Sequence, residues 1–359
     1  MRRSSQLSSL SGVEKTLGER LIARIRREGP ISVADYMHAC LHDPEDGYYA
    51  VRPGLGADGD FITAPHVSQM FGELVGLWAV DVWTTLGSPS RVRLVELGPG
   101  DGTLMSDVLR AARIAPGFLA AGEIVLVETS APLIARQAAT LKGHAPKWVS
   151  AIDQIDFNAP VIILANEFLD CLPILQAVRC GDGWRERRVG LDKNGKLAFE
   201  RGEPVAGPEA PTGALREWSP ALEAAGAAIG SLVAQVGGAA LLIDYGRAEP
   251  GFGDTLQALR RHQKEGPLDH PGRADLTAHV DFPAFLAAAE SAGAKAAPIL
   301  TQGEFLRGLG IEARAAALSR ANPDEADKVA RQLERLIAPD QMGELFKVAR
   351  VAAPGLTPP

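Results

Sequence analysis

The chain has 359 residues, of which 46% are hydrophobic and 23% charged, and its formal net charge is -7 at pH 7. The length predicts one large elaborated domain or two, and the composition is that of a globular protein with a sizeable core. The negative charge offers no basic footprint for nucleic acid, and no apolar run approaches the roughly 18 residues that a membrane span needs. We therefore expect neither nucleic acid nor a membrane as a partner.

The numbers and spacing of the cysteines and histidines indicate the cellular compartment and whether a metal site is expected. The three cysteines, Cys40, Cys171 and Cys180, lack metal-ligand spacing, and their small, odd number is typical of a reducing compartment. The seven histidines form no paired ligand pattern, so we expect no metal site. The predicted location is the cytoplasm of a bacterium. The Arg- and Ser-rich start of the chain leaves the mitochondrial matrix as the alternative.

The first 90 residues predict helices and one long loop. Apolar spacing predicts a helix over residues 15–28, a second short helix with Ser32 as its N-cap, and a third from Ser68 to about residue 85. A Gly-, Pro- and Asp-rich stretch separates the last two helices. Because long irregular loops in compact proteins are usually functional, we expect residues 1–90 to supply the lid of a binding site.

Residues 91–352 alternate apolar strands with helices. Strands are expected at "RVRLVEL", "EIVLVE", "PVIILAN" and "GGAALLIDYG". Continuous apolar strands that alternate with helices predict an α/β fold, a doubly wound and mainly parallel sheet covered on both faces. Two final strands, "KAAPIL" and "LFKVARVA", are expected to close the sheet with an antiparallel edge.

Two insertions and a tail complete the predicted organisation. Alternating apolar and polar residues around Asn194-Gly195 predict a β-hairpin inserted into the α/β core over residues 176–205. A helical insertion is expected over residues 302–338, between the two final strands. Residues 353–359 are expected to be a disordered tail.

The stretch "LVELGPGDGTL" joins a strand to a helix through Gly98, Gly100 and Gly102. A dinucleotide site needs a further glycine where this chain has Thr103, and an acid such as Glu96 is a poor neighbour for a pyrophosphate. An acid suits a cofactor that carries positive charge, and glycines let the backbone approach that cofactor closely. The pattern therefore predicts a site for S-adenosylmethionine (SAM).

Further residues are predicted to contact this cofactor. Glu128 ends the second strand, where an acid accepts the ribose hydroxyls, and Asp153 lies near the expected adenine position. In the N-terminal loop, Gly59, Asp60 and Thr63 are predicted to fold over the cofactor and exclude water, with Asp60 receiving its ammonium group. The alternative for this loop is a solvated turn.

Several stretches in order resemble the MidA family, a branch of class I SAM-dependent methyltransferases. They cover about residues 15 to 352 and include "GDFITAPHVSQMFGELVGLW", "VELGPGDGTLMSDVLR", "ANEFLDCLPI" and "DLTAHVDF". The resemblance implies the seven-stranded, Rossmann-like sheet of that class. It also implies protein arginine N-methylation, because mitochondrial members of the family methylate a core subunit of respiratory complex I during assembly. The implied partner is a protein substrate of this kind.

Two positions depart from the pattern of that family. Its glycine loop usually reads "GPGRG", where this chain has Asp101, and "TAPE" is usual where this chain has His66. Both residues are expected to flank the cofactor, so the departures affect the fine shape of the site.

The turn "ANEFLDCLP" after the third core strand holds the predicted catalytic residues. A guanidinium has a pKa above about 12, so it must lose a proton as or after it attacks, and carboxylates hold its planar fork of donors. We predict Glu167 as the main guanidinium clamp, Asp170 as a second carboxylate and Asn166 as a carbonyl acceptor near the reacting nitrogen. The alternative is that Asn166 and Asp170 only cap the following turn.

Two other classes of function stay open from the sequence. One is a SAM-dependent methyltransferase that acts on a small molecule, and the other is an assembly chaperone that binds SAM without turnover. The intact glycines and acids favour an enzyme. The oligomeric state is not indicated.

Overall fold

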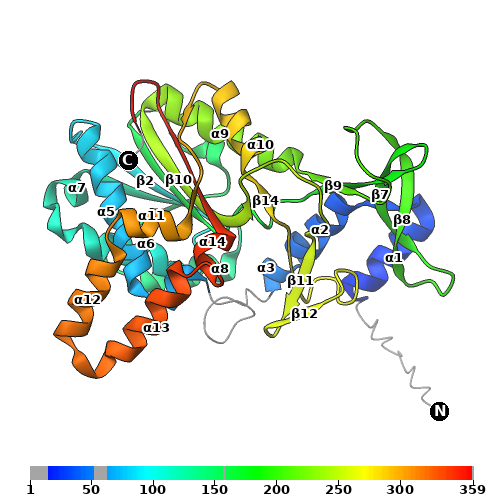
Figure 1. Cartoon of the computed structure of the whole chain (residues 1–359), viewed down its shortest axis with the longest axis horizontal. Helices are drawn as coiled ribbons and strands as arrows, with labels where there is room; N and C mark the ends of the chain where they lie inside the picture. Colours follow the sequence, from blue (N-terminus) through cyan, green and yellow to red (C-terminus); the bar gives the residue numbers. More distant parts are fainter. Residues whose placement is uncertain (1–14, 52–62, 157, 358–359) are drawn as a thin grey trace, which may run out of the picture.

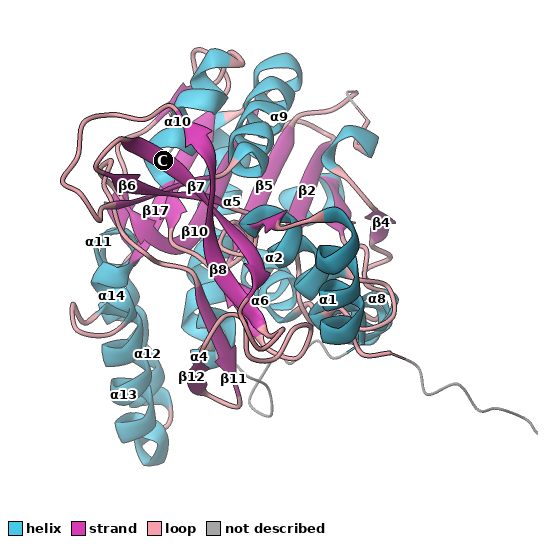
Figure 2. Ribbon diagram, turned by 90° about the vertical axis from the view of Figure 1, so that its right-hand side faces the viewer, coloured by secondary structure: helices cyan, strands magenta, loops and turns pink. Residues whose placement is uncertain are grey.

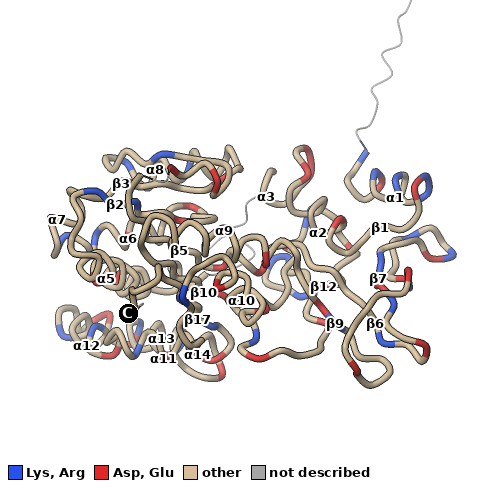
Figure 3. Tube along the Cα trace, turned by 90° about the horizontal axis from the view of Figure 1, so that it is seen from above, with Lys and Arg blue, Asp and Glu red and all other residues tan. Residues whose placement is uncertain are grey.

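The computed structural model describes residues 15–51, 63–156 and 158–357. Figure 1 shows two parts side by side, a larger α/β part and a smaller part that contains β7, β8, α1 and α2. None of the helices in the described ranges is long and apolar enough to cross a membrane. Figure 3 shows acidic and basic residues interspersed along the described trace of both parts.

The larger part is built on a sheet whose main path runs β15-β17-β10-β5-β2-β3-β4. Its strands are β2 (Val92–Leu97), β3 (Gly122–Val127), β4 (Lys147–Val149), β5 (Val161–Asn166), β10 (Gly238–Arg247), β15 (Lys295–Ala296) and β17 (Phe346–Ala352). The first five of these pair in parallel, whereas β17 is antiparallel to β10 and β15 is antiparallel to β17. Two short strands, β14 (Val280–Asp281) and β16 (Leu300–Thr301), pair with β10 and β17. The predicted doubly wound, seven-stranded sheet with an antiparallel edge is confirmed.

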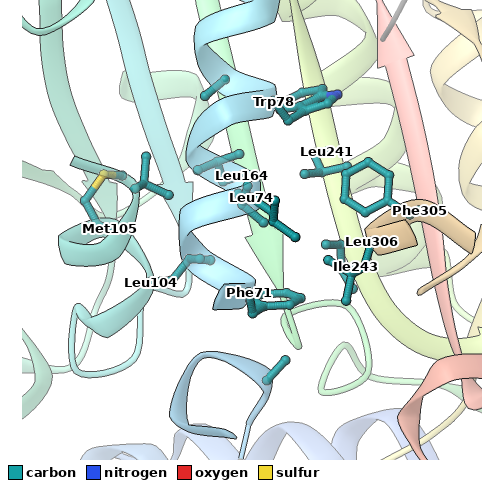
Figure 4. Close-up of a cluster of buried hydrophobic side chains, with 14 of the residues drawn as sticks. Phe71, Leu74, Trp78, Leu104, Met105, Leu164, Leu241, Ile243, Phe305 and Leu306 are labelled. Carbon is teal, nitrogen blue, oxygen red and sulfur yellow. The ribbon is translucent and has the colours of Figure 1, made fainter. Parts of the chain in front are cut away.

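Helices cover both faces of this sheet, as Figure 2 shows. They include α5 (Gln69–Thr85) and α6 (Thr103–Ala111) on one face, and α9 (Pro220–Val236) and α10 (Phe282–Ser291) on the other. Side chains of β10 alternate accordingly: Leu241 and Ile243 join the first core, and Leu242 joins the second. In the first core, Phe71 and Trp78 of α5 lie over the sheet (Figure 4).

A glycine sets the distance between α5 and α6. A Cβ at Gly72 would lie 2.5 Å from the Cβ of Asp107, which no side chain tolerates. The helices therefore approach closely at Asp107, in the middle of α6. This contact sets the spacing between α5 and the helix that follows the glycine-rich turn.

The expected hairpin is part of a larger antiparallel sheet in the smaller part. That sheet has the order β1-β7-β6-β9, with β8 paired to β7. Its strands are β1 (Ile31–Ser32), β6 (Leu175–Cys180), β7 (Gly183–Leu191), β8 (Leu197–Val205) and β9 (Leu215–Trp218). The β7–β8 turn lies at Asn194-Gly195, as predicted, with Gly195 at φ 77°. Helices α1 (Leu17–Glu28) and α2 (Val33–His42) share one hydrophobic core with this sheet.

A third sheet, of three strands, lies between β10 and α10 in the chain. It consists of β11 (Gln257–Arg260), β12 (Gln263–Glu265) and β13 (Asp275–Thr277). Ala258 and Leu276 are buried in the same hydrophobic core as residues of α1 and α2. The N-terminal helices and two insertions that lie far apart in the sequence thus make one small unit.

The helical insertion occupies the predicted residues. It comprises α11 (Gln302–Gly308), α12 (Ile311–Ala321) and α13 (Ala326–Ile337), followed by α14 (Met342–Leu345). Arg314 of α12 pairs with Glu73 of α5 at 2.8 Å, and α13 contacts the short helix α4 (Ala64–Val67). Residues 353–357, expected to be part of a disordered tail, instead form a turn in which Leu356 packs against the main core.

Candidate active site

The carboxyl ends of β2 and β5, together with the N-terminal segment, enclose one cavity. This edge of a doubly wound sheet is where such folds bind ligands. Six predicted site residues line the cavity: Thr63, Glu96, Gly98, Gly100, Asn166 and Glu167. The structure therefore brings four of the predicted cofactor residues and two of the predicted catalytic residues to one place.

The glycine-rich turn has the left-handed backbone that its sequence suggests. Gly98, Gly100 and Gly102 have φ values of 59°, 56° and 86°. A Cβ at Gly98 would lie 2.8 Å from a ring carbon of Phe168, so this position also needs glycine for packing. Gly102 caps α6 and does not line the cavity. It lies against α8 (Ala131–Thr140), where an added Cβ would meet Gln137 at 3.4 Å.

Glu96 makes this cavity suitable for a positively charged ligand. Its side chain is 3% exposed and lines the cavity, and its Oε2 has no hydrogen-bond partner among the described residues. Burial raises the pKa of Glu96 well above its usual range, and the nearby charge of Asp101 acts in the same direction. A buried carboxylate without a partner is stabilised by a cation or by hydrogen-bond donors. The ammonium and sulfonium groups of SAM fit this requirement.

Glu128 ends β3 as predicted, but its carboxylate is held by its own turn. The N–H groups of Thr129 and Ser130 donate to Oε1 over 2.8 and 2.7 Å, and Gln137 donates to Oε2 over 3.2 Å. Thr129, and not Glu128, lines the cavity. Asp153 lies in a short 3-10 turn over residues 152–154 and does not line the cavity either. The ribose and adenine roles of these two acids remain predictions.

Sequence reasoning missed Gln137, which lies behind the glycine-rich turn. Its side chain is 0% exposed, and its Nε2 also donates to the carbonyl oxygen of Gly100 over 2.8 Å. Its Oε1 accepts from the indole N–H of Trp148 over 2.8 Å. A lone glutamine in an amphipathic helix gives no signal of this position in the sequence.

Asn166 and Glu167 form the other wall of the cavity, at the end of β5. Glu167 has a left-handed backbone with φ 50°, which is uncommon for a residue with a side chain and often marks a functional turn. Its Oε1 accepts from the N–H of Ala64 over 3.1 Å and from Asn166 Nδ2 over 3.0 Å. Asn166 Oδ1 is buried with no partner among the described residues. The wall thus offers hydrogen-bond acceptors to a ligand.

Glu167 interacts with two further buried carboxylates, Asp170 and Asp244. Burial and the charge of Asp170 raise the pKa of Glu167 to about 7. Asp170 is 7% exposed and does not line the cavity, so the structure places it behind Glu167 rather than beside it. Asp244 accepts from the N–H groups of Leu169 and Asp170 over 2.8 and 3.2 Å. Burial raises the pKa of both Asp170 and Asp244.

Described residues of the N-terminal segment also line the cavity. Gly59 and Asp60, predicted to fold over the cofactor, lie outside the described residues. Thr63 is the N-cap of α4 and lines the cavity. His42 of α2 and Tyr49 of α3 (Tyr48–Val51) also line it, and sequence reasoning did not assign them to the site.

A seven-stranded path with an antiparallel β17, a glycine-rich turn after β2 and a buried acid beside that turn define a class I SAM-dependent methyltransferase. A family model described as "Putative S-adenosyl-L-methionine-dependent methyltransferase" matches residues 74–300. The chain belongs to this family.

Relatives and solved structures agree with that assignment. The chain is 36% identical over 373 residues to "Protein arginine methyltransferase NDUFAF7, mitochondrial" of Danio rerio, covering 94% of this chain and 87% of the relative. The Homo sapiens protein of the same name is 35% identical over 358 residues, covering 91% and 81%. A "likely methyl transferase from Burkholderia thailandensis bound to S-adenosyl-homocysteine" superposes with a TM-score of 0.82 at 30% identity, covering 94% and 91%. The predicted family, enzyme class and SAM cofactor are confirmed.

Proposed function

We propose that the protein transfers a methyl group from SAM to an arginine side chain of a protein substrate. One observation carries the proposal: Asn166 and Glu167 present acceptor atoms to the same cavity that holds Glu96 and the glycine-rich turn. A guanidinium has five N–H donors and no acceptor, so an acceptor-lined wall is complementary to it. The names of the relatives, which are protein arginine methyltransferases, support the same acceptor.

In this proposal the chain supplies alignment and a proton acceptor. Bound SAM supplies an electrophilic methyl group on a sulfonium. Glu96 and the backbone of Gly98 and Gly100 would hold it. Asn166 Oδ1 and Glu167 Oε2 would hold the guanidinium at the reacting edge, and a carboxylate there localises positive charge on the nitrogens that do not react.

Glu167 is also suited to receive the proton that methylation releases. Its pKa of about 7 matches the operating pH, which is the condition for an effective general base. The Ala64 N–H and Asn166 Nδ2 both bind Oε1, so among the described residues Oε2 is left for the substrate. We assign Asp170 an indirect role, since its charge raises the pKa of Glu167 from behind.

The proposed substrate is a respiratory complex I subunit or its bacterial equivalent, as the MidA resemblance implies. The compartment stays a prediction. We place the protein in the bacterial cytoplasm, with a mitochondrial location as the alternative that the names of the relatives favour.

Labelling with tritiated SAM tests the function. A lysate that lacks the protein should give a labelled protein band when purified enzyme is added, and its hydrolysate should contain labelled methylarginine. The Glu167→Gln variant is the matched control, because it preserves size and should leave that band unlabelled. Label found only in small molecules would overturn the protein substrate, and SAM binding without any label would indicate a chaperone.

A further inference from the structure

The short helix α4 touches both walls of the cavity. At its first residue, the N–H of Ala64 donates to Glu167 Oε1 over 3.1 Å. Two residues later, His66 Nε2 lies 2.9 Å from Asp101 Oδ2 in the glycine-rich turn. Thr63, His66, Asp101 and Glu167 all line the cavity. One turn of helix therefore connects the cofactor-binding turn to the predicted catalytic carboxylate.

Both ring nitrogens of His66 have partners, which fixes the orientation of the ring. Nδ1 lies 2.8 Å from Thr63 Oγ1, while Nε2 faces Asp101. Asp101 in turn accepts the N–H of Thr103, the first residue of α6, over 3.0 Å. The chain of contacts thus runs from the N-cap of α4 to the N-terminus of the helix that follows the glycine-rich turn. A protonated imidazole donates at both nitrogens and satisfies this chain.

The charged groups around His66 favour that protonated form. Asp101 faces it from the glycine-rich turn, Glu167 from the end of β5 and Asp107 from α6. The hydrogen bond to Asp101 raises the pKa of His66 above its usual value against the opposing effect of burial, and it holds the pKa of Asp101 at about 2. Helix α13, which also contacts α4, carries Lys328, which pairs with Glu325 at 2.9 Å.

We propose that His66 is a positioning residue that, through its contact with Asp101, locks α4 onto the glycine-rich turn and so fixes the cofactor site and Glu167 in one geometry. The predicted effect on cofactor affinity depends only on the fold and on membership of the SAM-dependent methyltransferase family. The effect on turnover rests on the proposed function of Glu167. The two effects have separate readouts.

A charge exchange tests the contact without relying on activity. The affinity for S-adenosyl-homocysteine is measured by calorimetry for wild type, His66→Glu, Asp101→Arg and the double variant. We expect each single change to weaken binding by about tenfold or more, the usual scale for a charge-assisted hydrogen bond. The double variant restores an opposite-charge pair and should recover to within about threefold of wild type.

A matched exchange on α1 controls for charge itself. Arg24 and Glu28 form an exposed pair at 3.1 Å outside the cavity, so exchanging them should leave the affinity unchanged. Thermal unfolding of each variant reports whether it folds, and His66→Gln with Asp101→Asn replaces the exchange if a variant does not. A double variant no tighter than the weaker single, or singles that bind like wild type, would overturn the proposal.

The pH profile of kcat/KM tests the connection to Glu167. The cationic His66 lowers the pKa of Glu167, so His66→Gln should move the acid limb of the profile to higher pH. An unmoved limb in a variant with weakened cofactor affinity would remove Glu167 from the proposal. If Glu167→Gln is itself active, the proposed function fails, and the affinity measurements still decide the contact between His66 and Asp101.

Discussion

Gln137 Nε2 donates to the carbonyl oxygen of Gly100 over 2.8 Å, so a side chain of α8 holds the middle of the glycine-rich turn from behind. The same nitrogen reaches Glu128, and the amide oxygen accepts from Trp148. These three contacts join the ends of β2 and β3 to β4 through one fully buried amide. A left-handed glycine turn is intrinsically mobile, and this amide restricts it.

Replacing Gln137 should therefore weaken both stability and cofactor binding. Gln137→Met keeps the shape but removes one hydrogen bond from each of three part-buried groups, which should lower the free energy of unfolding by about 1–3 kcal/mol. Affinity for S-adenosyl-homocysteine should fall about tenfold, because the turn must be ordered on binding. Urea denaturation and calorimetry measure the two effects. Gln235→Met, at an exposed glutamine of α9, is the control; equal effects in the two variants would contradict the prediction.

The second prediction separates binding from catalysis at Glu167. Glu167→Gln keeps the contacts at the cavity wall but removes the charge, so SAM affinity should stay near that of wild type. The single-turnover rate should fall by on the order of a hundredfold, the usual scale for one preorganised electrostatic contact. Glu312→Gln, an exposed acid of α12, serves as the control. A Glu167→Gln variant with a normal rate on the protein target would show that another group does this work.

The main sheet was predictable because its signals are local. Buried strands such as β5 and β10 are continuous apolar runs, and Glu167 follows a strand end directly. The sequence does not predict helix α9, since its Ala- and Gly-rich residues form only a weak apolar stripe and its packing against α10 is a tertiary contact. The strands β11–β13 are short and polar, so tertiary contacts decide them.

The sequence predicts which residues form the site better than it predicts the contacts between them. His66 and Asp101 appear in the sequence as two unrelated departures, 35 positions apart, and only the fold brings them to 2.9 Å. Asp170 follows Glu167 by three residues, yet the tight turn directs it behind the cavity wall. Side-chain contacts between distant segments produce no periodic pattern in a sequence, so the contacts of Gln137 cannot be predicted from it.

The pH dependence of turnover follows from Glu167. In the proposed mechanism the ionised carboxylate binds the guanidinium and accepts the proton, and its pKa of about 7 lies above the ordinary glutamate value. Activity should therefore be low at pH 5.5 and rise through a midpoint near 7, in the direction of the ionised form. The measurement is kcat/KM from about pH 5.5 to 9. A flat profile across this range would exclude Glu167 as the group that titrates.

Asp170 is predicted to change the midpoint of the pH profile of kcat/KM. Its charge raises the pKa of Glu167, so Asp170→Asn should move the acid limb to lower pH, with a smaller loss of maximal rate than Glu167→Gln. His66→Gln is expected to move the same limb the opposite way, which makes the two variants controls for each other. A rate loss as large as that of Glu167→Gln, with the limb unmoved, would instead show that Asp170 touches the substrate.

Glu96 should strengthen cofactor binding but lower the free energy of unfolding of the cofactor-free protein at neutral pH. Its folded-state pKa lies well above the unfolded value of 4.5, so the folded state holds a proton that the unfolded state releases. The contribution of Glu96 to the free energy of unfolding is therefore greatest below about pH 4.5. It decreases by up to about 1.4 kcal/mol per pH unit as the pH rises toward the folded-state pKa. Glu96→Gln removes that loss.

The variant should thus unfold at higher urea concentration than wild type at pH 7.5, with the advantage shrinking toward pH 5. Its affinity for S-adenosyl-homocysteine should fall, because the amide no longer attracts the ammonium group of the ligand. Glu334→Gln, on the exposed side of α13, controls for the loss of one charge. A stability difference that is the same at both pH values would mean that Glu96 is ionised in the free protein, with a partner for its charge.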